Sequence, residues 1–388
     1  MVMKIAYCIP DLHNSSGMER VLTVKANYLA LHYNYEVHII ITDGHATSPF
    51  FHLESLINVH QLDVNFDEMY QYPFLHRALI YRKKMGYFKK KLDCLLNQIK
   101  PDITISLLRR DINILNKMTD GSIKIGELHF NKTYYRKLPY NKLPMFVNRV
   151  IETFWLKSLI GKLRGLEAFI VLTHEDAANW KELKNVFVIP NPISFVTEHY
   201  SDCMDKQVIA VGRYVGQKGF DLLIPVWKKV IEKHPDWQLK IYGEGWMANN
   251  LQKQIDELGL GGSCWLEHPQ VDIAKRYCES SIFVLSSRFE GFGLVIVEAM
   301  SCGLPIVSFA CPCGPKDIIS EGVDGFLVFP FDLDDMANKI CYLIEHEDIR
   351  QEMGRRAILK ASEYNLDIIG EKWRHLFESL MNNRDGMV

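Results

Sequence analysis

Residues 286–307 read SSRFEGFGLVIVEAMSCGLPIV and carry the strongest structural signal in the chain. They follow the apolar run 281–285, which predicts a buried strand, and Glu290 to Gly293 form a turn before a helical pattern. A strand, a glycine turn and a helix gather backbone N–H groups that suit a phosphate group. At about 100° per residue, Glu290 and Glu298 are expected on one helical face, where both can line one cleft.

These two carboxylates have a restricted choice of ligand. A carboxylate beside a phosphate site repels the phosphate, whereas a sugar or ribose hydroxyl can donate a hydrogen bond to it. We therefore expect Glu290 and Glu298 to accept hydrogen bonds from the hydroxyls of a sugar and a ribose.

The same stretch closely resembles the donor-binding signature of the retaining glycosyltransferases of family 4, which have the GT-B fold. That signature reads Glu-Gly-Phe-Gly, then Glu-Ala-Met, then Gly-x-Pro-Val, and it differs here at Cys302, where a small residue is usual, and at the closing Ile306-Val307. The resemblance implies an α/β chain with two facing Rossmann-like, doubly wound parallel-sheet domains and a cleft between them. It also implies donor contacts from this turn and helix, namely Glu290, Gly291, Phe292, Gly293, Leu294 and Glu298.

Composition agrees with two domains and with a reducing compartment. The chain has 388 residues, 48% of them hydrophobic, which is enough for sizeable cores. No apolar run reaches the roughly 18 residues that span a bilayer. The opening MVMKIAYCIPDL is expected to be a first strand and not a signal peptide. The nine cysteines show no paired spacing, which favours a reducing cytoplasm over a disulfide framework.

Charge is distributed unevenly. Residues 1–195 hold 25 Lys and Arg against 18 Asp and Glu, which leaves 20 against 29 for the rest. Within the basic half, residues 132–164 carry eight basic residues and one acid, interleaved with aromatic residues, namely Tyr134, Tyr135, Tyr140, Phe146, Phe154 and Trp155. A helix here can lie on an anionic membrane, peripherally on its cytoplasmic face, or pack on its own sheet with a solvated basic face.

The first half alternates strands with helices, which predicts a parallel sheet. Expected strands cover 3–10, 36–41, 59–62, 102–106, 123–127, 168–171 and 186–189, and a helix is expected over 18–31. The fingerprint G-x-G-x-x-G is absent, which disfavours a dehydrogenase. The resemblance implies that the loop at Gly17, followed by Glu19-Arg20, faces the donor's phosphates and the acceptor. It also implies that His129, after the strand 123–127, lies beside the transferred sugar.

The second half begins with a strand at 208–211 and the loop Gly212 to Gly219. Arg213 and Lys218 on this loop are suited to binding a pyrophosphate. The planar guanidinium of Arg213 can donate two hydrogen bonds, and the ammonium group of Lys218 acts as a point charge. The resemblance gives them that role. It also implies that Gly243 and Glu244, after the strand 239–242, border the nucleoside.

The expected domains are an acceptor-binding domain at 1–195, a hinge at 196–206 and a donor-binding domain at 207–365. A last helix at 366–388 is expected to cross back to the first domain, as in the fold that the sequence resembles. The pair Asp332 and Asp334 resembles an Asp-x-Asp metal motif, but its place before a helical run favours a helix N-cap. We expect no metal and no cofactor apart from the sugar nucleotide.

The resemblance implies transfer of a hexosyl unit from a nucleoside diphosphate sugar, with UDP-sugar favoured, to a glycan or lipid-linked saccharide, as in cell-surface polysaccharide synthesis. Retention and a front-side mechanism follow from it, with Glu290, His129, Arg213 and Lys218 as catalytic candidates and no nucleic-acid partner. Two alternatives stay open. One is a sugar-nucleotide epimerase or hydrolase of the same architecture, and the other is a carbohydrate-binding scaffold without activity.

Overall fold

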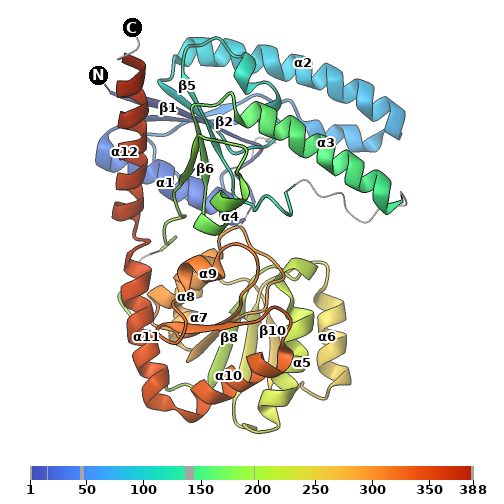
Figure 1. Cartoon of the computed structure of the whole chain (residues 1–388), viewed down its shortest axis with the longest axis vertical. Coiled ribbons are helices and arrows are strands. Elements are labelled where there is room, and N and C mark those ends of the chain that lie inside the picture. The colour runs from blue at the N-terminus through green and yellow to red at the C-terminus, as the bar shows by residue number, and fades with distance from the viewer. Residues whose placement is uncertain (1, 15, 44–47, 136–143, 196, 386–388) are drawn as a thin grey trace. The chain divides into compact units, whose positions relative to one another are not determined.

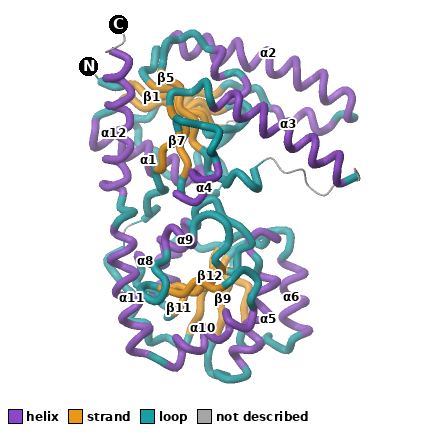
Figure 2. The backbone as a smooth tube through the Cα atoms, viewed as in Figure 1, coloured by secondary structure: helices purple, strands orange, loops and turns teal. Residues whose placement is uncertain are grey.

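The computed structural model describes residues 2–14, 16–43, 48–135, 144–195 and 197–385. Of the predicted features, residues 136–143 of the basic stretch with Tyr140, residue 196 of the hinge and residues 386–388 of the last helix lie outside these residues. The chain divides into two compact units, each with its own sheet (Figures 1 and 2). Unit 1 comprises Met1–Leu172, Ala177–Ile189 and Leu366–Val388, and unit 2 comprises Thr173–Asp176 and Pro190–Asn365.

Unit 1 contains a parallel sheet of seven strands in the order β3-β2-β1-β4-β5-β6-β7. The strands are β1 Lys4–Ile9, β2 Glu36–Ile41, β3 Asn58–Gln61, β4 Ile103–Ser106, β5 Ile123–Glu127, β6 Ala168–Val171 and β7 Val186–Val188. Each predicted strand of the first half is present, with ends shifted by one residue at most.

Helices cover both faces of this sheet. They are α1 Gly17–Tyr33, α2 Phe74–Ile99, α3 Met145–Leu163 and α12 Leu366–Asp385, with 3₁₀ turns η1 Phe66–Gln71, η2 Asp111–Asn113 and η3 Leu115–Lys117. The residues of the short helix α4 His174–Asn179 are divided between the two units. Side chains alternate along β1, so Ile5 and Tyr7 pack with α1 and α12 while Ala6 and Cys8 pack with α2. Both faces are buried, as a parallel sheet requires.

Unit 2 contains a parallel sheet of six strands in the order β10-β9-β8-β11-β12-β13. The strands are β8 Gln207–Val211, β9 Gln238–Tyr242, β10 Cys264–Glu267, β11 Ile282–Leu285, β12 Ile306–Phe309 and β13 Gly325–Val328. The helices are η4 Gly216–Lys218, α5 Phe220–Ile231, α6 Ala248–Glu257, α7 Ile273–Cys278, α8 Leu294–Ser301, α9 Pro315–Ile318, α10 Leu333–Glu345 and α11 Glu347–Ser362.

Strand order reverses once in each sheet, between β1 and β4 in unit 1 and between β8 and β11 in unit 2. The loops that leave the carboxyl ends of two such strands run in opposite directions and open a crevice, where doubly wound sheets bind ligands. The doubly wound α/β fold predicted from the sequence is confirmed in both units. The residues that follow β8 and β11 therefore define the first candidate site.

Candidate active site

Lys218 and Glu290 meet at the strand reversal of unit 2. Lys218 ends η4 after β8, Glu290 follows β11, and the Lys218 Nζ lies 2.6 Å from the Glu290 Oε1. Their side chains are 14% and 7% exposed. The Ser287 hydroxyl donates to the same carboxylate oxygen at 2.6 Å. The structure thus joins two of the predicted site residues from different loops and fixes the carboxylate with two donors.

Two glycines allow the loops to approach this closely. Gly219 has a φ of +66°, and a Cβ there would lie 2.0 Å from the Ser286 carbonyl oxygen. A Cβ on Gly243 would lie 1.9 Å from the Gly212 carbonyl oxygen. No other residue fits at either position, so the loops after β8, β9 and β11 form one tightly packed edge.

Arg213 is an exposed cation on this edge. Its loop is anchored, because the Tyr214 N–H donates to the Glu244 carbonyl at 2.7 Å and the Tyr214 hydroxyl lies 2.7 Å from the Ile241 carbonyl. The Arg213 side chain is exposed and forms no hydrogen bond or ion pair with any residue that the structure describes. Glu244 is exposed beside it. A free guanidinium on a fixed loop is available to an anionic ligand.

Helix α8 begins later than the sequence pattern predicted. It starts at Leu294, after Gly293 turns the chain through a φ of +90°. Glu290 therefore lies in the loop, and the expectation that Glu290 and Glu298 share one helical face is wrong. Glu298 is on α8, 2% exposed, and its Oε1 accepts a hydrogen bond from the Ser194 hydroxyl at 2.5 Å.

Phe292 contributes packing to this turn. Its side chain is buried and meets the Tyr364 ring edge-on, with the ring centroids 5.6 Å apart. Gly291 and Leu294 on either side are half-buried. The aromatic ring anchors the turn while the backbone around Gly291 stays near the surface.

The remaining predicted residues, Gly17 and His129, belong to unit 1. Gly17 is the first residue of α1, and a Cβ there would meet no atom within 4 Å. Glu19, two residues on, is buried, and burial raises the pKa of its carboxyl. His129 follows β5, and its Nε2 lies 3.2 Å from the Glu127 Oε1. These groups lie at the carboxyl edge of the first sheet.

Sequence reasoning missed an ion pair beneath His129, formed by Lys25 of α1 and Glu127 at the end of β5. One signal was available. Val21, Lys25 and Leu29 recur every four residues on the buried face of the predicted helix, so Lys25 is a charge where an apolar residue belongs. A charge on a buried face needs a partner or a function.

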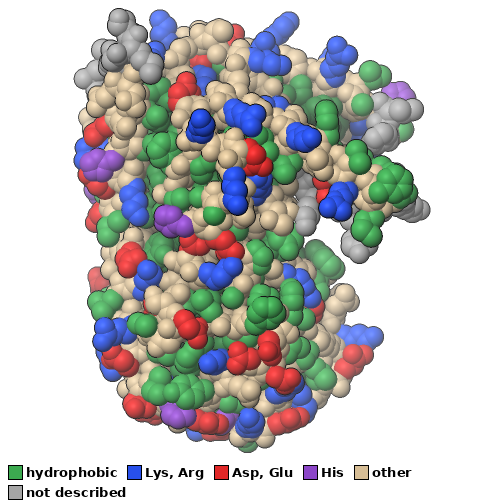
Figure 3. Space-filling model, in the orientation of Figure 1, with side chains coloured by type: hydrophobic (Ala, Val, Ile, Leu, Met, Phe, Trp, Pro, Cys, Tyr) green, Lys and Arg blue, Asp and Glu red, His purple; other side chains and the backbone are tan. Residues whose placement is uncertain are grey.

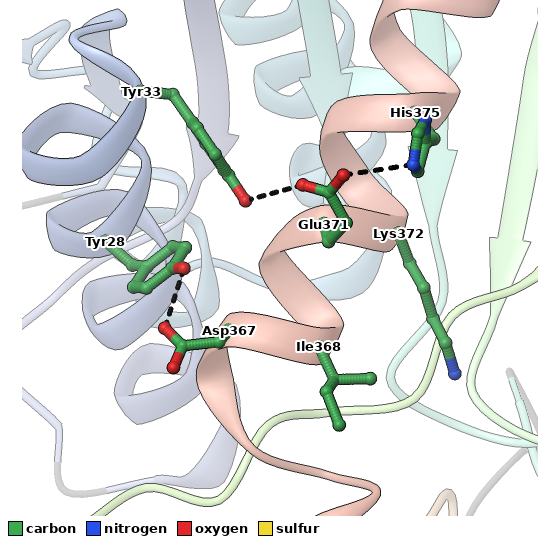
Figure 4. A pocket seen from close by; sticks show the side chains of 7 residues that line it. All are labelled: Tyr28, Tyr33, Asp367, Ile368, Glu371, Lys372 and His375. Atoms are coloured by element: carbon green, nitrogen blue, oxygen red, sulfur yellow. Dashed lines mark hydrogen bonds and ion pairs between the residues drawn. The ribbon is translucent and has the colours of Figure 1, made fainter.

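Unit 1 also holds an open cavity of about 560 Å³ between α1 and α12 (Figure 4). It is lined by Tyr28, Tyr33, Asp367, Ile368, Glu371, Lys372 and His375. The Tyr28 hydroxyl donates to Asp367 at 2.8 Å and the Tyr33 hydroxyl to Glu371 at 3.1 Å. Hydrogen bonding to Arg374 lowers the pKa of Glu371 to about 2 despite the opposing effect of desolvation. These contacts fasten α12 to α1.

No metal centre is formed by the described part of the chain, where no group of three or more His, Cys, Asp or Glu side chains converges. The predicted N-cap is confirmed, because the Asp332 Oδ1 accepts a hydrogen bond from the Asp335 N–H at 2.9 Å. Asp334 pairs with Lys229. No described helix is long and apolar enough to span a bilayer.

The sequence of this chain is similar to those of known glycosyltransferases. Residues 197–360 match the family of glycosyl transferases group 1. An uncharacterized glycosyltransferase of Methanocaldococcus jannaschii is 30% identical over 73% of this chain and 81% of its own length. The GalNAc-α-(1→4)-GalNAc-α-(1→3)-diNAcBac-PP-undecaprenol α-1,4-N-acetyl-D-galactosaminyltransferase of Campylobacter jejuni is 26% identical over 98% of this chain and 100% of its own.

The fold is similar to that of solved glycosyltransferase structures. A mutant of S. aureus TarM, crystallised with fondaparinux, α-GlcNAc-glycerol and UDP, superposes with a TM-score of 0.76 over 97% of this chain and all of its own. The two sequences are 18% identical. At that identity the likeness concerns the fold alone.

Proposed function

The chain belongs to the glycosyltransferases and carries a group 1 domain over residues 197–360. We propose that it moves a hexosyl unit from a nucleoside diphosphate sugar to a saccharide acceptor with retention at the anomeric carbon. A UDP-sugar is the proposed donor, and a glycan or lipid-linked saccharide of cell-surface polysaccharide synthesis is the proposed acceptor. The UDP bound by TarM and the undecaprenol-linked acceptor in the name of the Campylobacter relative support these two choices.

One observation carries the proposal: Arg213, which is exposed and pairs with no described residue, and Lys218, which pairs with Glu290, lie on one loop at the strand reversal of unit 2. A pyrophosphate can bind the planar guanidinium group of an arginine and the ammonium group of a lysine at the same time. It can also draw Lys218 away from Glu290, so that a sugar hydroxyl takes the place of the ammonium group on that carboxylate. Donor binding and sugar orientation are then linked through one ion pair.

Retention needs either a carboxylate nucleophile or attack on the face that the phosphate leaves. In the proposed step, the bond from the anomeric carbon to the phosphate oxygen breaks and the acceptor oxygen bonds to that carbon on the same face. The acceptor proton passes to the departing phosphate oxygen. Arg213 and Lys218 stabilise the charge that develops on this phosphate, which is a large effect when the donors are fixed in advance. The proposed reaction needs no divalent metal, so full activity in saturating chelator is expected.

A thermal-shift screen of UDP- and GDP-sugars tests the donor. A ligand at 100 times its dissociation constant stabilises the fold that binds it by about 2.7 kcal/mol, which a melting curve detects. Donor consumption is then followed with and without saccharide acceptors. Turnover without an acceptor would favour an epimerase or hydrolase, and binding with no turnover under any condition would favour a scaffold.

The proposed function includes contact with an anionic membrane through α3, which would bring a lipid-linked acceptor to the enzyme. The last turns of α3 pack inward at Leu159 and Leu163, but Phe146, Val150 and Phe154 are 71%, 66% and 70% exposed. These three recur every four residues and so share one face. Exposed basic residues accompany them on α3, and Figure 3 shows Lys and Arg side chains gathered over α2 and α3.

Acidic lipid is the proposed binding partner of α3 because its charge is complementary to the basic residues of this helix. Arg149 and Lys157 are exposed near the apolar stripe. Vesicle co-sedimentation tests it, with Phe146→Ser/Phe154→Ser as the variant and Trp246→Ser, an exposed aromatic of unit 2, as the control. We expect binding to acidic vesicles that salt and the α3 variant abolish. Equal binding to neutral vesicles, or binding insensitive to salt, contradicts it.

A further inference from the structure

The buried pair beneath His129 combines two charges that are costly to bury. The Lys25 Nζ lies 2.7 Å from Oε1 and 2.5 Å from Oε2 of Glu127. The two side chains are 3% and 2% exposed. Replacing such a pair by apolar residues of similar volume is often neutral or stabilising. Stability of the fold is therefore a poor explanation for keeping both charges.

The surroundings of the pair hold it in place. The Lys25 Nζ lies 4.0 Å from the centroid of the Trp373 ring of α12 and 5.1 Å from that of Tyr7. Burial raises the pKa of Glu127, but the charges of Lys25 and His129 outweigh it and bring this pKa to about 2. Glu127 is thus a carboxylate at neutral pH, acts only as an acceptor, and has few ways to turn.

The same carboxylate oxygen faces His129. Its Oε1 accepts from Lys25 and lies 3.2 Å from the His129 Nε2. The distance is short enough for an ion pair. The buried Nε2 has no hydrogen-bond partner among the described residues. Contacts of catalytic groups are often misaligned without substrate and tighten when it binds.

We propose that Glu127 and Lys25 are positioning residues for His129. The Glu127 carboxylate faces Nε2 at 3.2 Å and attracts a proton to that nitrogen of the neutral ring, which selects the tautomer whose Nδ1 carries a lone pair. Lys25 holds Glu127 in that role by occupying both of its oxygens. The role of this lone pair rests on the proposed function: Nδ1 accepts a hydrogen bond from a hydroxyl of the transferred sugar.

Nuclear magnetic resonance of protein labelled with ¹⁵N-histidine tests the proposal without any activity. Long-range ¹H–¹⁵N spectra at pH 8, above the ordinary pKa of histidine, distinguish the two tautomers. The His129 signal is assigned by its absence from His129→Gln. We expect the Nε2–H tautomer in the wild type and a mixture in Lys25→Met/Glu127→Leu. His375, which pairs with Glu371 at 3.0 Å, serves as the control signal that stays unchanged.

A second variant guards against a folding defect. Glu127→Gln keeps the volume, but its amide can donate as well as accept, so a mixture of tautomers is expected here too. Transfer turnover should fall about 10- to 100-fold in both variants, the range known for residues that orient metal-ligating histidines. UDP affinity should change less than about 2-fold, since Arg213 and Lys218 are untouched.

Two results overturn the proposal. One is a wild-type His129 protonated on Nδ1, and the other is an unchanged Nε2–H tautomer in whichever variant folds. Absence of transfer activity with every donor would count against the proposed function alone, because the tautomer is read independently. A merely structural role predicts lower melting temperatures with the tautomer preserved.

Discussion

Glu290 accepts hydrogen bonds from Lys218 and Ser287, whereas Glu298 accepts one from Ser194. We propose that Glu290 binds the hydroxyls of the transferred sugar and Glu298 those of the ribose. The sugar shifts towards the acceptor as its bond breaks, so the Glu290 contact can strengthen along the reaction. Glu290→Gln should therefore lower kcat about 10- to 100-fold, and Glu298→Gln should weaken UDP binding by about 10-fold.

Steady-state kinetics and calorimetric titration with UDP separate the two effects. UDP contains no sugar for Glu290 to hold, and its diphosphate competes with Glu290 for Lys218, so UDP affinity should be preserved or raised in Glu290→Gln. These roles are contradicted if Glu290→Gln weakens the binding of UDP as much as Glu298→Gln does.

Asp111 is a buried carboxyl with one oxygen lacking a partner. Burial raises its pKa from 3.8 to about 6, although Ser106 and backbone donors oppose the shift. Because the pKa of Asp111 is higher in the folded state than in the unfolded state, protonation of this carboxyl stabilises the fold. The stabilisation is fully present below pH 3.8 and is lost as the pH rises through about 6. Asp111→Asn should thus stabilise unit 1 at pH 7.5 by up to about 3 kcal/mol.

Melting curves from pH 3.5 to 8 test this. The advantage of Asp111→Asn over the wild type should shrink as pH falls and vanish below about pH 4. Asp93→Asn on α2, whose carboxylate is half-exposed, should show no such pH-dependent gain. A gain that is constant with pH would mean that the ionised carboxylate is not its source.

Among the elements, α12 is fastened to α1 through a glycine contact. A Cβ on Gly370 would lie 2.3 Å from the Cε1 of Tyr28, whereas one on Gly161 of α3 would meet nothing within 4 Å. Gly370→Ala should cost about 1–3 kcal/mol by overpacking, even though alanine favours a helix. Gly161→Ala should stabilise by up to about 1 kcal/mol. Equal effects in thermal unfolding would show that Tyr28 can move aside.

The elements themselves were largely readable from the sequence. Strands of a parallel sheet are short apolar runs, so their positions followed from composition, and Asp332 before an amphipathic run marked the start of α10. The start of α8 was misjudged because Gly293 takes a left-handed conformation, which turns the chain before the helix begins. A helical pattern alone does not reveal such a turn.

For the whole molecule, sequence alone indicated the loops that carry Arg213, Lys218 and Glu290. It could not indicate the pairing of Lys25 with Glu127, because the two lie 102 positions apart and meet only when α1 packs on the sheet. Nor could it decide how α3 packs. An alternating basic and aromatic segment suits either a membrane or a sheet, and only the packing of its last turns separates the buried part from the exposed stripe.

The central claim is that the free cation on the loop after β8 binds the diphosphate of the donor. Calorimetric titration of UDP and GDP into the wild type and Arg213→Gln tests it most directly, with Arg356→Gln, which removes a surface arginine of α11, as the control. We predict that UDP binds the wild type and the control equally and Arg213→Gln about 10- to 100-fold more weakly, as for the loss of a charge-assisted hydrogen bond. Equal affinity in the wild type and Arg213→Gln, or no affinity of the wild type for either nucleotide, would contradict the account.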